Sequence, residues 1–150
     1  MAKAPKVTLA EVEAYGLKWI PRLHLLDWQI EFRMKRRELG VAGTCWAEFR
    51  RRAAQIWIDP DLHNVVGLDV SYIKIGARRN RLVESVVVHE LLHILEKPLE
   101  TQMSSILWKT GKPEPDSWVL FQDYSEMMID SFVRILLEAD AAGAWSTPSP

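Results

Sequence analysis

Cysteine is nearly absent from this chain of 150 residues, in which Cys45 is the only one. A single cysteine cannot form an internal disulfide, and a thiolate zinc site needs several cysteines. We therefore exclude a disulfide scaffold and a cysteine-rich zinc domain, and expect a reducing, intracellular setting. Cys45 lies in an apolar, strand-like run, which favours a small core residue over a catalytic nucleophile.

Long apolar runs are also missing. No stretch approaches the length of a membrane span, and the N-terminus has no apolar region typical of a signal peptide. There is no internal repeat. We expect a cytoplasmic monomer that does not enter a membrane, with a single domain over residues 1–142 and a flexible tail over residues 143–150.

Charge is nearly balanced overall, at −1, but it is unevenly distributed. Residues 1–81 hold 15 Lys/Arg and 9 Asp/Glu, a balance of +6, whereas residues 82–150 hold 4 and 11, a balance of −7. Basic clusters occur at Lys35–Arg37, Arg50–Arg52 and Arg78–Arg81. They are open to two interpretations, a nucleic-acid surface or solvated ends of strands and helices, and we favour the second.

Periodicity predicts a mixed α+β fold. Thr8 and Glu11 form a capping-box pattern ahead of a helix to about Leu26, with Pro21 as a kink or break. Alternation of apolar and polar residues predicts strands over 28–34, 44–50 and 54–59, and residues 70–75 are either a fourth strand or a loop. We expect a small, three- to four-stranded, mostly antiparallel sheet packed on two helices.

The first of these two helices is predicted from about Asn80 to Leu95, where Val88, Leu91, Leu92 and Leu95 form a stripe expected to be buried. Lys97–Pro98 is predicted to end it. The second helix is predicted over residues 118–139. The segment between them, 97–117, is expected to be an inserted loop or lid.

Within the first helix, His89-Glu90-Leu91-Leu92-His93 has the spacing of a metal site. Positions four apart lie on one face of a helix, so both imidazoles can reach one ion. Zn²⁺ accepts such ligands and lowers the pKa of a bound water, and Glu90 is placed to take the proton of that water. The alternative is an amphipathic helix that carries two histidines by chance.

A third zinc ligand is expected from the second helix, where Glu126 and Asp130 are four apart on one face. We predict that Glu126 binds zinc and that Asp130 accepts a hydrogen bond from a ligating histidine. The alternative is a solvated acidic face. Glu96 is on the same straight helix as His89, too far along the axis to join the same ion. His24 and His63 are interpreted as surface or locally bonded residues.

The motif His89-Glu90-x-x-His93 followed by Glu126-x-x-x-Asp130 resembles the gluzincin metallopeptidases. The small size and the short sheet before the first helix resemble minimal gluzincins and small metallopeptidases predicted in phage and bacterial genomes. The resemblance covers residues 28–138. It implies a zincin-like fold and a zinc-dependent metalloendopeptidase.

In this family resemblance His89, His93 and Glu126 bind zinc, Glu90 is the general base and acid, and Asp130 orients His89. The edge strand of the sheet would pair with an extended protein or peptide substrate. The residue that stabilises the oxyanion is open, with Tyr124 and Tyr72 as candidates. The 97–117 segment would act as a lid, or as a plug that keeps the enzyme latent.

Two other functions are alternatives. One is a DNA-associated protease similar to the SprT-like family, motivated by the basic clusters, although that family uses a third histidine downstream and none follows His93. The other is a zinc-binding regulatory or interaction domain without turnover. The presence of Glu90 argues against the latter, because a structural site needs no base beside the metal.

Overall fold

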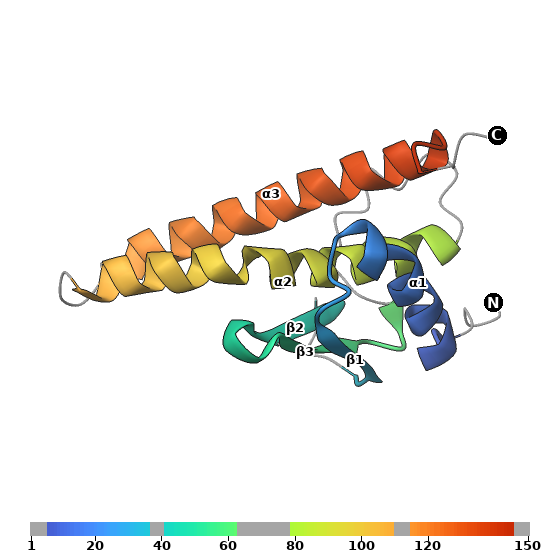
Figure 1. The fold of residues 1–150 in the computed structure, drawn as a ribbon, viewed down its shortest axis with the longest axis horizontal. Coiled ribbons are helices and arrows are strands. Elements are labelled where there is room, and N and C mark those ends of the chain that lie inside the picture. The colour runs from blue at the N-terminus through green and yellow to red at the C-terminus, as the bar shows by residue number, and fades with distance from the viewer. Residues whose placement is uncertain (1–5, 37–40, 63–78, 110–114, 146–150) are drawn as a thin grey trace. The chain divides into compact units, whose positions relative to one another are not determined.

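The computed structural model describes residues 6–36, 41–62, 79–109 and 115–145 of the chain (Figure 1). These residues form three α-helices and one three-stranded sheet, so the mixed α+β class is confirmed. In chain order the elements are α1 (Leu9–Arg22), β1 (Gln29–Met34), β2 (Gly43–Glu48), the 3₁₀ turn η1 (Phe49–Arg51), β3 (Ala53–Ile58), α2 (Arg79–Lys109) and α3 (Pro115–Ala141). The possible strand over 70–75 lies outside the described residues.

The chain divides into two compact units, residues 1–102 and 103–150. The first holds α1, the sheet and most of α2, and the second holds the end of α2 and α3. The prediction of one domain over residues 1–142 stays a prediction.

The sheet has the strand order β1-β3-β2. β2 and β3 are antiparallel and joined through η1, after which Arg52 adopts a left-handed conformation at φ 48°. β1 pairs with the other side of β3 and is parallel to it, with Gln29 opposite Ala53 and Met34 opposite Ile58. The expectation of a mostly antiparallel sheet was therefore wrong for one of the two pairings, that of β1 with β3. β1 and β2 are not a hairpin, because β3 lies between them.

One face of the sheet is buried. Its residues alternate along the strands, as period-2 patterning requires, and include Phe32, Ala47, Ala54, Ile56 and Ile58, all at most 9% exposed. Side chains of the opposite face are polar or more exposed. In the first unit, α1 and α2 cover the buried face (Figure 1). The core of this unit therefore lies between a sheet and two helices.

Helix α1 begins as the sequence predicts. The Thr8 side chain accepts from the Glu11 backbone N–H at 3.3 Å, and the Glu11 carboxylate accepts from the Thr8 N–H at 2.8 Å, which completes the capping box. The helix ends at Arg22, one residue after Pro21 and four before the predicted end. Gly16 allows close packing on the sheet, because a Cβ there would lie 2.4 Å from the Phe32 ring.

Buried Glu84 joins α1 to α2. Its carboxylate accepts from Lys18 Nζ at 2.6 Å and from Trp19 Nε1 at 2.8 Å, while Arg81 on its own helix lies at 3.5 Å. Glu84 is 4% exposed and Trp19 is fully buried. A buried carboxylate needs such donors, so this group fixes how α1 packs against the start of α2.

Helix α2 continues through Pro98 to Lys109, so the predicted end at Lys97–Pro98 was wrong. A proline inside a helix removes one backbone hydrogen bond and disfavours the helix without forbidding it. Thr101 Oγ1 donates to the Lys97 carbonyl at 2.8 Å, and Lys97 Nζ pairs with Glu100 at 2.7 Å. Residues 97–109 and 115–117 are helical instead of forming the expected loop, and residues 110–114 lie outside the described part.

The predicted buried stripe of α2 is confirmed for Val88, Leu91 and Leu92, which are at most 8% exposed. Leu95 is 48% exposed, so its expected burial was wrong. Ile94 is buried instead, at 1%. The buried arc of α2 is thus rotated from the predicted one towards the Val87 and Ile94 side.

In the second unit, α3 buries residues four apart, Ser125, Ile129, Val133 and Leu137. Other large apolar residues of α3 are exposed, among them Leu120, Tyr124, Met127 and Ile135. The helix is longer at both ends than the predicted 118–139.

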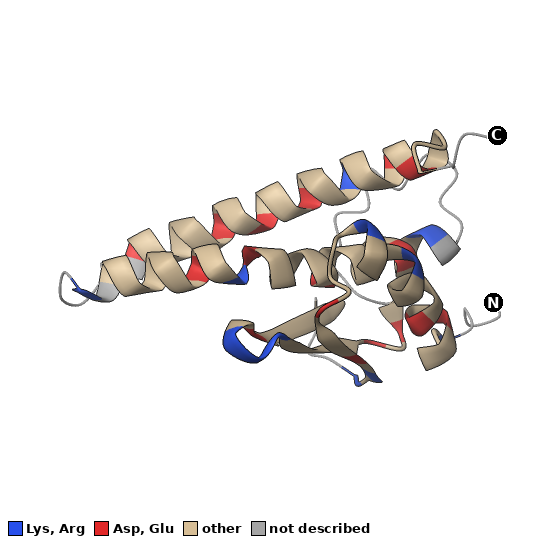
Figure 2. Ribbon diagram, viewed as in Figure 1, with Lys and Arg blue, Asp and Glu red and all other residues tan. Residues whose placement is uncertain are grey.

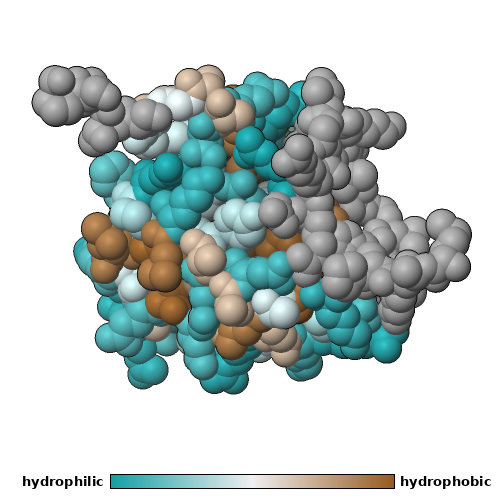
Figure 3. All heavy atoms as spheres, turned by 90° about the vertical axis from the view of Figure 1, so that its right-hand side faces the viewer, coloured by the Kyte–Doolittle hydropathy of each residue, from teal (hydrophilic) through white to brown (hydrophobic). Residues whose placement is uncertain are grey.

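Among the residues described, no helix has the length and hydropathy to cross a membrane. The surface drawn in Figure 3 carries apolar residues in small groups separated by hydrophilic ones.

Candidate metal centre

Helix α2 presents His89 and His93 from one face. Their Nε2 atoms lie 3.2 Å apart, and the rings meet edge to face with centroids 5.0 Å apart. Zinc binds imidazole nitrogen at about 2.0–2.1 Å in tetrahedral geometry, which places two such nitrogens about 3.3 Å apart. Both histidines are partly exposed. The two nitrogens therefore stand at the separation of two ligands of one ion, as the i, i+4 spacing predicts.

Glu90 follows His89 on the buried side of α2 and is 4% exposed. It faces β2, where it fills the space beside Gly43. A Cβ on Gly43 would lie 2.6 Å from Glu90 Oε1, 2.9 Å from Cγ and 3.0 Å from Cδ. Only glycine leaves room for the Glu90 side chain at this point of the strand. The carboxylate is thus held between α2 and the edge strand.

Cys45 lies two residues along β2 from Gly43, on the same side of the strand. Burial raises the pKa of its thiol to about 12, and the negative charge of Glu90 adds to this shift. At neutral pH the residue is a thiol, a poor nucleophile and a poor metal ligand. This agrees with the expectation that Cys45 is not a catalytic nucleophile, although the residue is only partly buried and does not belong to the core.

Glu96 makes a contact that sequence reasoning missed. Its Oε2 lies 3.0 Å from Nδ1 of His93, the ring nitrogen that points away from His89. The prediction that Glu96 cannot join an ion together with His89 considered only direct binding. The signal was present in the sequence, because residues three apart on a helix are neighbours.

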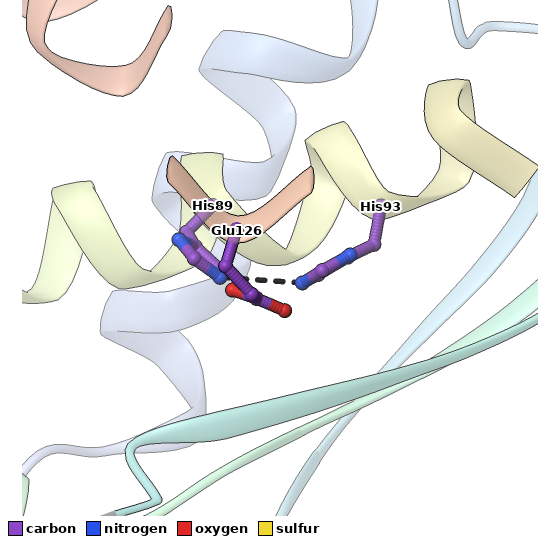
Figure 4. A group of neighbouring side chains, drawn as sticks. All are labelled: His89, His93 and Glu126. Carbon is purple, nitrogen blue, oxygen red and sulfur yellow. Dashed lines mark hydrogen bonds between the residues drawn. The ribbon is translucent and has the colours of Figure 1, made fainter. Parts of the chain in front are cut away.

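Figure 4 draws His89 and His93 with Glu126, and its dashed line is the contact between the two Nε2 atoms. Each of these three residues is of a type that can offer one ligand atom to a metal ion. Glu126 is exposed and lies on α3, in the second unit. Its role as third ligand therefore stays a prediction, and the two histidines and Glu90 of the first unit carry the site.

The other predicted site residues are placed as follows. Asp130 lies on α3 and is partly exposed, and its contact with His89 stays a prediction. Tyr124 is 68% exposed, and its assignment to the oxyanion stays a prediction as well. Tyr72 and His63 lie outside the described residues. His24 is exposed at the end of α1, as expected of a surface histidine.

The side chains of the first unit fit a zinc ion better than a harder cation. Two imidazole nitrogens are donors that zinc prefers, whereas Mg²⁺ and Ca²⁺ take mainly oxygen. Comparisons of the chain with protein-family models, with curated proteins and with solved structures gave no match.

Proposed function

We propose that this chain is a zinc-dependent metallopeptidase with a zincin-like arrangement of the gluzincin type. His89 and His93 would bind Zn²⁺, with Glu126 as the third ligand, and Glu90 would be the general base. The observation that carries the proposal is the convergence of the two Nε2 atoms at 3.2 Å, with the buried carboxylate of Glu90 on the adjacent residue. A metal that only stabilised the fold would not need this carboxylate beside it.

Zinc, when bound, would lower the pKa of a water molecule and polarise the carbonyl of a peptide bond. The protein itself would supply the proton transfers. Glu90 would accept the proton of the water and pass it to the nitrogen of the leaving amine. Its packing against Gly43 would hold the carboxylate in one position during both transfers.

The substrate would be an extended peptide, because β2 is an edge strand of the described sheet. The Asp59 N–H donates to the Ala42 carbonyl at 2.8 Å. In an antiparallel pair every second residue directs its backbone N–H and C=O to the partner strand, so Thr44, Trp46 and Glu48 direct theirs to β3. Gly43, Cys45 and Ala47 therefore direct theirs to the other side. A peptide added there would run beside the residue that packs on Glu90.

Zinc content after purification without added metal tests the ligand set. We expect about one zinc ion per wild-type chain and a marked loss in Glu126→Ala. Asp123→Ala is the matched control, since it removes another exposed acid of α3 three residues away. Zinc in the wild type and the control but not in Glu126→Ala would support Glu126 as a ligand. Equal zinc in all three would move the third ligand elsewhere, and no zinc in any would overturn the metal site.

Hydrolysis of an unfolded protein substrate by the zinc-loaded chain tests the activity. We expect cleavage that stops when a chelator removes the metal and returns when zinc is added back. Cleavage that persists after complete metal removal would overturn the proposal. A chain that binds zinc stoichiometrically but cleaves nothing in a broad peptide library would favour the alternative of a silent zinc-binding domain.

The alternative of a DNA-associated protease draws on the basic residues around η1 (Figure 2). Two of them are paired with acids: Arg51 with Glu48 at 3.2 Å, and Arg52 with Asp27. Such pairs reduce the positive field that phosphates would meet. For this reason we favour a peptidase that does not bind nucleic acid over a DNA-associated protease.

A further inference from the structure

Glu96 and His93 form a carboxylate–imidazole pair on α2. Glu96 Oε2 lies 3.0 Å from His93 Nδ1, and the two side chains are 9% and 24% exposed. A carboxylate this well covered keeps little of its hydration, so a bond to a ring N–H is its natural compensation. The pair spans one helical turn and needs no other element to form.

The pairing determines which nitrogen of His93 carries hydrogen. An ionised carboxylate only accepts hydrogen bonds, and a neutral imidazole has one donor and one acceptor nitrogen. With Nδ1–H donating to Glu96, the lone pair of His93 is on Nε2. That is the atom that faces His89 Nε2 at 3.2 Å. The same contact fixes the rotation of the ring, because Nδ1 then donates to Glu96 and Nε2 faces His89.

We propose that Glu96 is a positioning residue of the metal centre, which holds His93 in the tautomer and orientation that present Nε2 to the ion. This inference rests on the proposed zinc site but concerns a residue outside its ligand set. Carboxylates that accept from the second nitrogen of a ligating histidine fix its tautomer and raise its basicity. Glu96 reaches that nitrogen from the helix that bears His93 itself, so the orientation of this ligand does not depend on α3.

The tautomer can be measured without metal. Nitrogen-15 NMR of the metal-free full chain at a pH where His93 is neutral reports which ring nitrogen carries hydrogen. We expect the Nδ1–H form in the wild type and in Glu96→Gln, whose amide oxygen can also accept. Glu96→Ala should show a mixture of both forms. The wild type in the Nε2–H form, or an unchanged ratio in Glu96→Ala, would overturn the proposal.

Zinc affinity gives the second readout. Glu96→Ala should bind zinc about 10- to 100-fold more weakly than the wild type, and Glu96→Gln should recover part of the loss. The matched control is Glu100→Ala, which removes a carboxylate one turn further along α2 that pairs with Lys97 at 2.7 Å. We expect its affinity to be that of the wild type. Alanine is the best helix former, so α2 should be intact in both variants, and circular dichroism would verify this.

Failure of this inference is distinguishable from failure of the proposed function. Unchanged zinc affinity in Glu96→Ala, with zinc bound by the wild type, would overturn the role of Glu96 and leave the metal site standing. A wild type that binds no zinc would overturn the metal site, and the tautomer experiment would still decide whether Glu96 orients His93, because it is done on the metal-free chain.

Discussion

Gly43 of β2 lies directly against the side chain of Glu90 of α2, so closely that a methyl group on the glycine would fall 2.6 Å from the carboxylate oxygen. This contact joins the edge strand to the proposed general base. It gives Gly43 a role that its own chemistry does not suggest. Because Gly43 has no side chain, it leaves the space that the Glu90 carboxylate occupies.

Gly43→Ala should therefore impair the proposed catalysis while the proposed zinc ligands stay intact. The added methyl must displace Glu90 or push β2 away, and a displacement of about 1 Å in a catalytic group can cost about 100-fold in rate. Stability should fall by about 1–3 kcal/mol, as in other overpacked cores. Peptide hydrolysis, zinc content and chemical denaturation would be measured on one preparation.

Gly16→Ala is the matched control for this variant. It introduces an equally close contact, 2.4 Å from the Phe32 ring, between α1 and the sheet. We expect a comparable loss of stability but wild-type activity per folded molecule. If both variants lose activity equally, Gly43 acts through general stability and not through Glu90.

Glu90→Gln should keep zinc and lose hydrolysis. The amide has nearly the same shape but cannot take a proton from water, and a positioned acid–base group contributes about 100- to 10,000-fold to rate. Glu31→Gln serves as control, since Glu31 is exposed on β1 and pairs with Arg33. A Glu90→Gln variant that cleaves peptides at the wild-type rate would show that the assigned mechanism is wrong.

Local patterns predicted much of the fold. The period-2 alternation located three strands to within about two residues, and the Thr8–Glu11 pattern located the start of α1. The face shared by His89 and His93 also followed from spacing alone. In each case the information lies within a few residues along the chain, where backbone geometry allows few alternatives.

Features that depend on distant residues were not predictable in this way. Nothing near β1 shows that it pairs parallel with β3, because β2 comes between them in sequence and occupies the opposite edge. The contact of Gly43 with Glu90 crosses 47 residues. Pro98 was misjudged for another reason: a proline disfavours a helix locally, but α2 continues through it to Lys109.

Glu84→Ala should destabilise the first unit without touching the proposed metal centre. It would leave the N–H of the fully buried Trp19 without its acceptor and remove the ion pair with Lys18. An orphaned buried donor costs about 1–3 kcal/mol, and Lys18, which is about a third exposed, can turn to solvent and limit the additional loss. Denaturant unfolding would measure the change, with exposed Glu13→Ala of α1 as control. A loss no larger than that of the control would contradict the importance of this buried group.

Cys45 should be unreactive in the folded protein. Burial and the charge of Glu90 raise the pKa of its thiol from 9.0 to about 12, so the reactive thiolate is scarce at neutral pH. Because the pKa is higher in the folded than in the unfolded chain, the stabilising contribution of the thiol is complete below about pH 9 and is lost as the pH rises towards 12. Alkylation at pH 8 should therefore be slow in the native protein and fast in denaturant. Equal rates in both conditions would show that Cys45 is neither covered nor held beside Glu90.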